Sequence, residues 1–363
     1  MIDLTILKKM NIPFLFIIII ISSFGILNLY SLQSGAGSLY MIQSFWFMLG
    51  AFVLVALTLT DYRVFSDLSI TLYILNVLFL VFVLKFGVTR NFSTRWINLG
   101  FFLFQPSESM KLVLAFVLAN YFSSLDEDKA IGFKKLAYPF ILTLIPAFLI
   151  KKQPDLGSAA LLFVEFGVLM FMAKIKLRVW GTIVITIVVL LPLFWFFVLN
   201  GYHKKRIDAF MNPEKFAKTI AYQTIQAKFA IGSGKLKGKG FNKGPISKGK
   251  FVPEQETDFA FSVWAEEFGF IGSTFLISLY IILILFLFFL VKDSSDMLGF
   301  YLSISIISYF VFQILLNLLM VTGMFPVIGV PLPLFSYGGT NMLVTMGSLG
   351  VLFSIYVKRE SFD

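Results

Sequence analysis

Three carboxylates stand close together in the chain, directly before a long apolar run. Glu254, Glu256 and Asp258 fall within residues 251–270, which read F-V-P-E-Q-E-T-D-F-A-F-S-V-W-A-E-E-F-G-F. This pattern predicts acids at the boundary between a loop and a membrane helix, where one of them can serve as a general base. Asp258 also suits a simpler role, because an aspartate just before a helix commonly caps its N-terminus.

Few other side chains are available for catalysis. The chain has no cysteine and a single histidine, His203, which excludes disulfides, cysteine nucleophiles and clusters of thiolate or histidine metal ligands. Carboxylates, lysines, arginines and hydroxyls remain. No stretch has the spacing of a dedicated metal site, although Glu256 and Asp258 could share a divalent cation such as Mg²⁺ or Mn²⁺. We expect no cofactor beyond such a cation.

The elements that must position these residues are membrane helices. Of the 363 residues, 58% are hydrophobic, only 14% are charged and 45 are Phe, whereas a soluble domain has an apolar share of roughly 45–50%. The mean hydropathy is +0.88. Because apolar runs of about 20 residues recur along the chain, the sequence predicts an all-α polytopic membrane protein and excludes a β-barrel. About ten transmembrane helices are expected, at residues 11–30, 41–60, 67–87, 106–122, 136–150, 156–173, 178–200, 261–291, 297–320 and 336–357.

Lysine and arginine in the short loops predict the orientation of these helices, since such residues are retained on the cytoplasmic side. If the chain starts inside, the cytoplasmic segments carry twelve of them and the short outer loops carry five. Both termini are therefore expected in the cytoplasm, and the one long connection, residues 201–260, outside it. The whole chain, residues 1–363, is expected to form one membrane domain.

The loop 201–260 is strongly basic. It holds twelve Lys or Arg residues against five acids, a net charge of +7, which implies an anionic partner. Tyr222, Ile225 and Phe229 recur at helical spacing and predict a short amphipathic helix that stops at Gly232. The glycine-rich basic stretch after it can bind either the head groups of membrane lipids or a lipid-linked pyrophosphate. Without aromatic residues interleaved for base stacking, no nucleic acid is expected.

Charged residues also stand at two other helix starts. Glu108 and Asp155 follow prolines at the starts of the spans 106–122 and 156–173, near the positive ends of the helix dipoles. Helix initiation alone explains these acids. A functional role gains support from Lys111, on the same helix face as Glu108 and about one turn into the membrane, because a lysine at that depth usually faces a polar interior. Glu165 lies deeper in its span and has no assigned role.

Together the motifs carry a family resemblance. Seven of them follow one another from residue 95 to residue 340: R-W-I-N-L-G (95–100), Q-P-S-E-x-x-K-L (105–112), K-Q-P-D-L-G-S-A (152–159), A-I-G-S-G (230–234), F-V-P-E-x-x-T-D-F (251–259), A-E-E-F-G-F-I-G (265–272) and G-V-P-L-P-L-F-S-Y-G-G-T (329–340). In this order they resemble the SEDS family of shape, elongation, division and sporulation proteins, its RodA type more than its FtsW type. The chain departs from the usual family wording at Lys235, Ala260 and Asn341, where family members often have glycine, a bulkier apolar residue and a small hydroxyl residue.

The resemblance implies an activity and a set of site residues. It implies a peptidoglycan glycosyltransferase that polymerises lipid II outside the cytoplasmic membrane, working with a class B penicillin-binding protein as transpeptidase. The family's critical acid falls on Asp258. Other family positions important for activity, which we take as substrate-binding candidates, fall on Arg95, Glu108, Lys111, Lys152, Asp155, Gln226 and Ser336.

The chemistry of this transfer fits the side chains available. Joining a sugar C4 hydroxyl to the anomeric carbon of another sugar, with undecaprenyl pyrophosphate leaving, needs a carboxylate base and positive charge near the pyrophosphate. We hypothesise that Asp258 is the base, that the anomeric carbon is inverted, and that Arg95, Lys111 and Lys152 contact the pyrophosphate. A lipid II flippase is the alternative, although a transporter should place polar groups near the midplane. A scaffold that only recruits the transpeptidase is a third reading.

Overall fold

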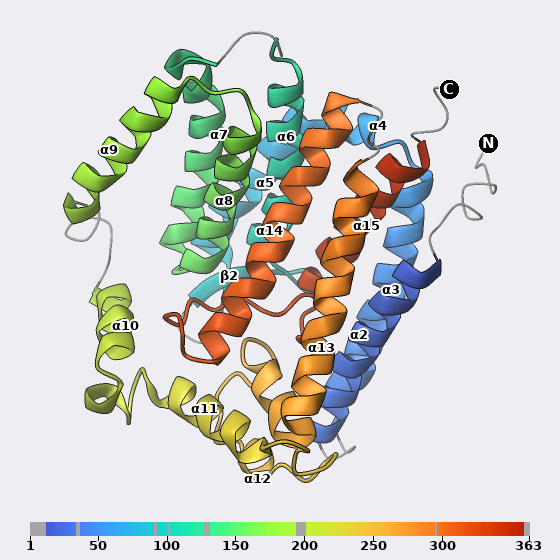
Figure 1. Cartoon of the computed structure of the whole chain (residues 1–363), viewed down its shortest axis with the longest axis vertical. Coiled ribbons are helices and arrows are strands. Elements are labelled where there is room, and N and C mark those ends of the chain that lie inside the picture. The colour runs from blue at the N-terminus through green and yellow to red at the C-terminus, as the bar shows by residue number, and fades with distance from the viewer. Residues whose placement is uncertain are drawn as a thin grey trace.

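A computed structural model describes residues 12–33, 37–90, 93–100, 102–126, 131–193, 201–292, 294 and 296–358. In the described residues, each of the ten predicted spans is a helix or lies largely within one, and shorter helices occupy the long loop (Figure 1). Residue 11 of the first predicted span and residues 194–200 of the span 178–200 lie outside the described residues. The helices are α2 (Ile12–Leu32), α3 (Leu39–Leu59), α4 (Tyr62–Asp67), α5 (Ser69–Phe86), α6 (Pro106–Ser123), α7 (Phe133–Lys152), α8 (Leu156–Met172), α9 (Leu177–Leu193), α10 (Gly201–Met211), the 3-10 helix η2 (Pro213–Phe216), α11 (Tyr222–Gly234), α12 (Pro245–Lys248), α13 (Ala260–Lys292), α14 (Met297–Val321) and α15 (Gly339–Lys358).

The protein is an all-α polytopic membrane protein. Seven helices of the described residues, α2, α3, α5, α7, α13, α14 and α15, are long and apolar enough to cross a membrane. α8 is apolar but shorter, with 17 residues, and α6 has polar first turns. The predicted count of about ten spans therefore stays a prediction.

The two ends of the helix bundle differ. In Figure 1 α15 ends in the upper part of the bundle and α2 runs downward from about mid-height, whereas α11 and α12 lie at the lower end. At the upper end Arg63 pairs with Asp296 at 2.7 Å and Lys358 pairs with Asp61 at 3.3 Å. The long basic loop and the end of α15 are thus on opposite sides of the bundle, as the predicted orientation requires.

A small antiparallel sheet, which no pattern in the sequence predicts, precedes α6. It is formed by β1 (Val88–Arg90), β2 (Ser93–Asn98) and β3 (Leu103–Phe104), with β2 in the middle. Val88 faces Trp96 and Ile97 faces Phe104 in the two registers. The strands are too short to leave an alternating pattern in the sequence. In the fold they carry Arg95 to the turn before α8, where it donates to the carbonyls of Gln153 and Pro154.

α13 is not the straight span that the apolar run 261–291 predicts. Gly269 has φ 64° and ψ −159°, which interrupts the helix. The indole nitrogen of Trp264 donates to the carbonyl of Gly272 at 2.9 Å, although a straight helix would separate these residues by about 12 Å along its axis. The chain therefore bends sharply at Gly269, and residues 260–268 fold back beside the later part of α13.

The helix predicted in the long loop is α11, but a different face of it is buried. Ala227, Ala230 and Gly234 are buried and α11 packs on α13, whereas Phe229, in the predicted apolar stripe, is 61% exposed. A side-chain carbon at Gly234 would lie 2.1 Å from the carbonyl oxygen of Ala265. The packing face consists of small residues, whereas the predicted stripe consists of large apolar side chains. The helix ends at Gly234 rather than at the predicted Gly232.

The connection between α14 and α15, residues 322–338, is rich in proline and glycine and has an irregular backbone. It is held by side chains from distant elements: Tyr280 donates to the carbonyl of Pro333 at 2.6 Å, and Gln43 donates to the carbonyl of Ser336 at 3.2 Å. Ile328 and Val330 lie against Gly157, where an added side-chain carbon would be 2.4 Å from Val330. Such backbone is tolerated at membrane depth when protein buries it.

Candidate active site

Asp258 lies in the turn directly before α13, against the connection 322–338. Its backbone carbonyl accepts a hydrogen bond from Asn317 Nδ2 at 2.8 Å. A side-chain carbon added at Gly329 would lie 3.3 Å from its Oδ2. The carboxylate is half-buried, and within the described chain no group donates a hydrogen bond to it. The helix-capping role is therefore not observed, and the carboxylate can accept a proton from a bound molecule.

The charge of Asp258 is finely balanced near neutral pH. Burial raises the pKa of its carboxyl group to about 7, and the carboxylates of Glu254 and Asp155 act in the same direction, whereas Arg95 and Arg206 lower it. A general base is most effective when its pKa lies near the working pH. A strongly perturbed carboxyl group beside arginines is therefore a candidate functional group on physical grounds.

Strand β2 brings Arg95 to the start of α8. The Arg95 guanidinium donates through Nε to the carbonyl of Gln153 at 3.2 Å and through Nη2 to the carbonyl of Pro154. Its Nη1 lies 3.7 Å from Asp155 Oδ1. Asp155 caps α8, accepting from the backbone N–H of Ser158 at 3.2 Å and from its hydroxyl at 2.8 Å. The structure thus brings together Arg95 and Asp155, which lie far apart in sequence. The charges of both act on the carboxylate of Asp258.

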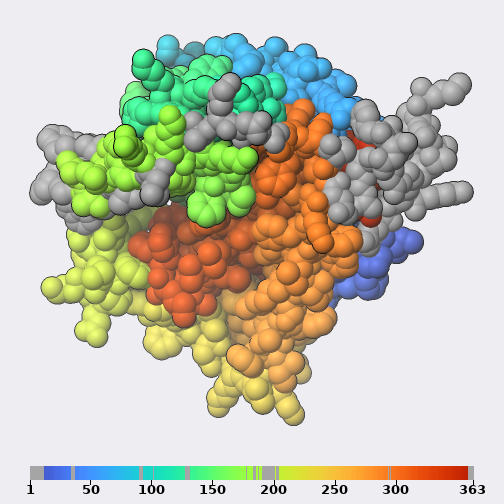
Figure 2. Space-filling model, turned by 45° about the horizontal axis from the view of Figure 1, so that its top comes forward, coloured from blue at the N-terminus to red at the C-terminus, as the bar shows by residue number. Residues whose placement is uncertain are grey.

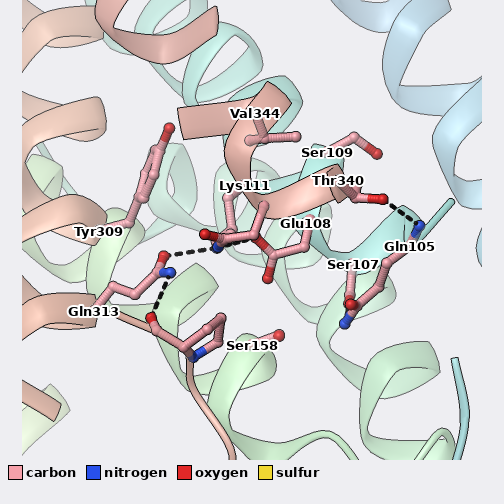
Figure 3. Close-up of polar contacts among 12 residues, drawn as sticks. Gln105, Ser107, Glu108, Ser109, Lys111, Ser158, Tyr309, Gln313, Thr340 and Val344 are labelled. Atoms are coloured by element: carbon pink, nitrogen blue, oxygen red, sulfur yellow. Dashed lines mark hydrogen bonds and ion pairs between the residues drawn. The ribbon is translucent and has the colours of Figure 1, made fainter. Parts of the chain in front are cut away.

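Glu108 and Lys111 form a buried ion pair on α6 (Figure 3). Lys111 Nζ lies 3.0 Å from Glu108 Oε2 and donates to Gln313 Oε1 at 2.8 Å. Asn341 Nδ2 donates to the same Glu108 oxygen at 2.8 Å. A smaller hydroxyl residue at position 341 would be too short for this bond, so the departure at Asn341 gives Glu108 an additional partner.

One face of α14 connects this ion pair to Asp258. Four buried polar residues recur on it at every fourth position: Ser305, Tyr309, Gln313 and Asn317. Gln313, whose amide oxygen holds Lys111, donates through Nε2 to the carbonyl of Pro331 at 3.0 Å. Asn317 donates to the carbonyl of Val330 at 2.7 Å as well as to Asp258. Gln313 and Asn317 therefore hold Lys111 and Asp258, respectively, against the connection 322–338.

Glu165 lies at the inner end of this polar face. It is fully buried, and its Oε2 accepts from the hydroxyl of Ser305 at 3.4 Å. Its Oε1 has no hydrogen-bond partner among the residues that the structure describes. The Lys111 ammonium acts electrostatically on it. The structure places Glu165 beside the Lys111 group, which no sequence motif indicates.

The remaining predicted site residues are more dispersed. Lys152 is exposed at the end of α7, with Nζ 4.7 Å from the ring centre of Phe148. Gln226 lines an open hollow of about 630 Å³ between α11 and the segment around Phe251. Ser336 is buried, donating to the carbonyl of Thr257 at 2.6 Å. Ser336 therefore ties the turn before Asp258 to the connection 322–338, while Lys152 and Gln226 stand apart from the buried groups.

The structure does not assemble a metal site in its described residues. No group of three or more histidine, aspartate and glutamate side chains there is arranged to hold a metal ion. Glu256 is half-buried, and its backbone carbonyl accepts from the N–H of Tyr337 at 2.9 Å. A divalent cation shared by Glu256 and Asp258 stays a prediction.

Three residues of the site are not among the predicted ones: Gln313, Asn317 and Arg206. Gln313 and Asn317 could have been found, because amide side chains four residues apart in the apolar run 297–320 are costly in a membrane and mark a polar interior. Arg206 donates through Nη1 to the carbonyl of Val327 at 2.7 Å. Nothing in the sequence distinguishes it from the other cations of the loop 201–260.

The fold and the site define a polytopic membrane protein with a charged centre gathered at one end of its helix bundle. The family model of FtsW, RodA and SpoVE, described as "Cell cycle protein", matches residues 3–361. The chain belongs to this family.

Named relatives and solved structures agree with the family. Peptidoglycan glycosyltransferase MrdB of Escherichia coli is 33% identical over 86% of this chain and 84% of its own. Peptidoglycan glycosyltransferase RodA of Treponema pallidum is 28% identical over 93% of this chain and 95% of its own. A chain of a peptidoglycan synthase complex that coordinates polymerization and crosslinking superimposes with a TM-score of 0.84 at 28% identity, covering 97% of this chain and 98% of that one. RodA of Thermus thermophilus gives a TM-score of 0.73 at 27% identity with the same coverage.

Proposed function

We propose that this chain is a peptidoglycan glycosyltransferase that joins the disaccharide units of lipid II into glycan strands, for cell elongation and rod shape. Relatives that align over most of their own length carry the name of this activity. The site of action is the outer face of the bacterial cytoplasmic membrane, which the loop charges favour.

The observation that carries the proposal is Asp258, a half-buried carboxylate that accepts no hydrogen bond from the described residues and has a pKa of about 7. Its carboxylate takes the proton of the acceptor sugar's C4 hydroxyl while that oxygen bonds to the anomeric carbon of the donor. The bond from this carbon to the pyrophosphate oxygen breaks, and undecaprenyl pyrophosphate leaves as an anion. A single displacement inverts the anomeric carbon.

Positive charge for the leaving pyrophosphate comes from the cations around Asp258. Arg95 and Arg206 both act electrostatically on its carboxylate, and fixed cations in a partly dry site stabilise developing negative charge strongly. Lys111 is buried and donates to Glu108 and Gln313, so it supports the leaving pyrophosphate through its charge rather than through an exposed donor. Lys152 and Gln226 bind more peripheral parts of the substrate, and a divalent cation held with Glu256 would neutralise further charge.

The partner that we propose is a class B penicillin-binding protein, which crosslinks the strands as they form. Support comes from the similarity to a chain of a synthase complex that coordinates polymerization and crosslinking. Transport of lipid II is a weaker candidate. It is favoured only by the buried polar face of α14, because transporters place such groups inside the bundle.

The deciding experiment is polymerisation of labelled lipid II by the full chain in liposomes with its transpeptidase partner. Asp258→Asn should fold and bind the partner but form no polymer, whereas Asp208→Asn, which removes an exposed acid from the same loop, should polymerise like the wild type. An active Asp258→Asn protein would disprove the role of the base. Movement of lipid II across vesicles with no polymer from any variant would instead establish transport.

A further inference from the structure

The segment 235–250 presents six lysines on one end of the molecule. It contains no acid, and all its lysines are exposed: Lys235, Lys237, Lys239, Lys243, Lys248 and Lys250. We call this segment the lysine shelf. It lies at the lower end of the bundle, around α12 and the lower end of α13 (Figure 1), and the yellow part of the chain projects there in the space-filling view (Figure 2).

The lysine shelf is fixed to the bend of α13 by backbone hydrogen bonds. The N–H of Phe270 donates to the carbonyl of Lys235 at 2.8 Å, and the N–H of Ile271 donates to the carbonyl of Leu236 at 3.1 Å. The N–H of Lys239 donates to the carbonyl of Glu266 at 3.0 Å. The interrupted helix at Gly269 makes these groups available, so the charges are held on a defined part of the backbone rather than on a free loop.

The acids beneath the lysine shelf are committed to other partners. Glu266 is buried and accepts from the backbone N–H groups of Ile246 and Ser247, both at 2.9 Å. Glu267 is also buried and accepts from the hydroxyl of Ser31. Neither carboxylate forms an ion pair with a shelf lysine in the described structure, so the shelf surface keeps its positive charge.

The lysine shelf stands at the edge of the lipid-facing surface. Phe270, Ile271 and Phe275, which follow the bend of α13, are 66%, 56% and 52% exposed, as expected for side chains in contact with lipid tails. The ring of Tyr30, near the end of α2, stacks on Phe241 of the shelf with centroids 6.2 Å apart. Aromatic rings gather at the membrane interface, so the shelf lysines lie at the level of lipid head groups.

We propose that the lysine shelf binds the phosphate groups of anionic phospholipids in the adjacent leaflet. Exposed Leu236 and Phe241 stand between the lysines, which suits a surface that inserts apolar side chains beneath the phosphates. We favour a bulk phospholipid over the lipid-linked substrate as the ligand, because the shelf and Asp258 are held by different elements. The backbone of the shelf is hydrogen-bonded at the bend of α13 around Gly269, whereas the backbone of Asp258 is hydrogen-bonded to Asn317 of α14. The inference does not depend on the proposed function.

The test compares lipid binding by two variants of equal charge. Native mass spectrometry of the full chain would measure bound phosphatidylglycerol against phosphatidylcholine for Lys235→Gln/Lys237→Gln/Lys239→Gln. The control is Lys205→Gln/Lys215→Gln/Lys218→Gln, exposed lysines of the same loop outside the shelf. Each lysine near an anionic surface contributes roughly a fivefold preference. The shelf variant should therefore lose at least about tenfold in preference for the anionic lipid, and the control little.

A measurement of lipid II polymerisation distinguishes phospholipid binding by the shelf from binding of the substrate pyrophosphate. In vesicles of phosphatidylcholine alone, the shelf variant should polymerise lipid II as fast as the wild type. Loss of polymerisation there would overturn the proposal and assign the lysines to the substrate pyrophosphate. An unchanged lipid preference, or an equal loss in the control variant, would also overturn it. If the wild type polymerises nothing, the proposed function fails while the lipid measurement still stands.

Discussion

Asp258 has an ionisation equilibrium near neutral pH, and this sets how the proposed reaction should depend on pH. The base acts in its deprotonated form, and burial raises its pKa to about 7. Polymerisation should therefore rise about tenfold per pH unit below 7 and level off above pH 8. Initial rates of lipid II polymerisation from pH 5.5 to 9 would show this, and a flat profile through pH 7 would contradict it.

The same pKa predicts an effect on stability. An aspartate in an unfolded chain has a pKa of about 3.9, so the folded protein holds the Asp258 proton more tightly than the unfolded chain does. The folded state is therefore favoured below about pH 4, and this contribution is lost as the pH rises through 7. The pKa difference of about 3 corresponds to roughly 4 kcal/mol. Because the carboxylate is only half-buried and solvent screens its charge, Asp258→Asn should stabilise the protein by on the order of 1–2 kcal/mol at pH 8 and by almost nothing at pH 4. Thermal unfolding of both proteins in detergent at the two pH values would measure this difference.

Removing the charge of Lys111 should destabilise the protein, because it breaks the buried pair with Glu108, whereas the same change at the exposed Lys152 should not. Lys111→Met leaves the Glu108 carboxylate buried without its cation, which should cost about 3–5 kcal/mol of stability. Adding Glu108→Gln to Lys111→Met should recover part of this loss, since no buried charge remains. Lys152→Met serves as the control because Lys152 is exposed. Equal melting temperatures for Lys111→Met and Lys152→Met would refute the importance of the pair.

At the scale of elements, α14 holds the reaction centre together through Asn317. Asn317→Asp keeps the shape of the side chain but removes the amide hydrogens that hold the carbonyls of Asp258 and Val330. It also adds a negative charge near Asp258, which should raise the apparent pKa of the pH–rate profile. We expect kcat to fall about 10–100-fold, with KM for lipid II changing less, because positioning acts on the reacting geometry.

A matched variant on the same helix controls for general damage to α14. Ser308 is buried, but its hydroxyl donates only to the carbonyl of Ser305 in its own helix. Ser308→Ala should keep kcat and the pH profile of the wild type. If Asn317→Asp and Ser308→Ala behave alike, α14 does not position Asp258.

At the scale of the whole molecule, the predicted orientation can be tested directly, because the chain has no cysteine of its own. Lys237 and Lys134 are both exposed, the first on the lysine shelf and the second at the start of α7. In intact cells, a maleimide that cannot cross the membrane should label Lys237→Cys and leave Lys134→Cys unlabelled until the cells are opened. The reverse pattern would place the long loop and Asp258 in the cytoplasm.

Much of this architecture could be predicted from the sequence. Apolar runs are long enough to identify the membrane helices, since any charged residue in lipid is costly, and the motifs around Arg95, Glu108, Asp155 and Asp258 indicate the family and the critical acid. These signals are local: each depends on composition, on spacing within a few residues, or on a short motif.

Only the tertiary structure decided how the charges meet. The bend at Gly269 returns Trp264 to Gly272. Arg95 reaches Asp155 across sixty residues, and Asn317 reaches Asp258 across fifty-nine. Sequence spacing does not encode such contacts, because they depend on which helix faces pack together. The same packing sets the burial that raises the pKa of Asp258, so the chemistry of this acid is a property of the fold rather than of its motif.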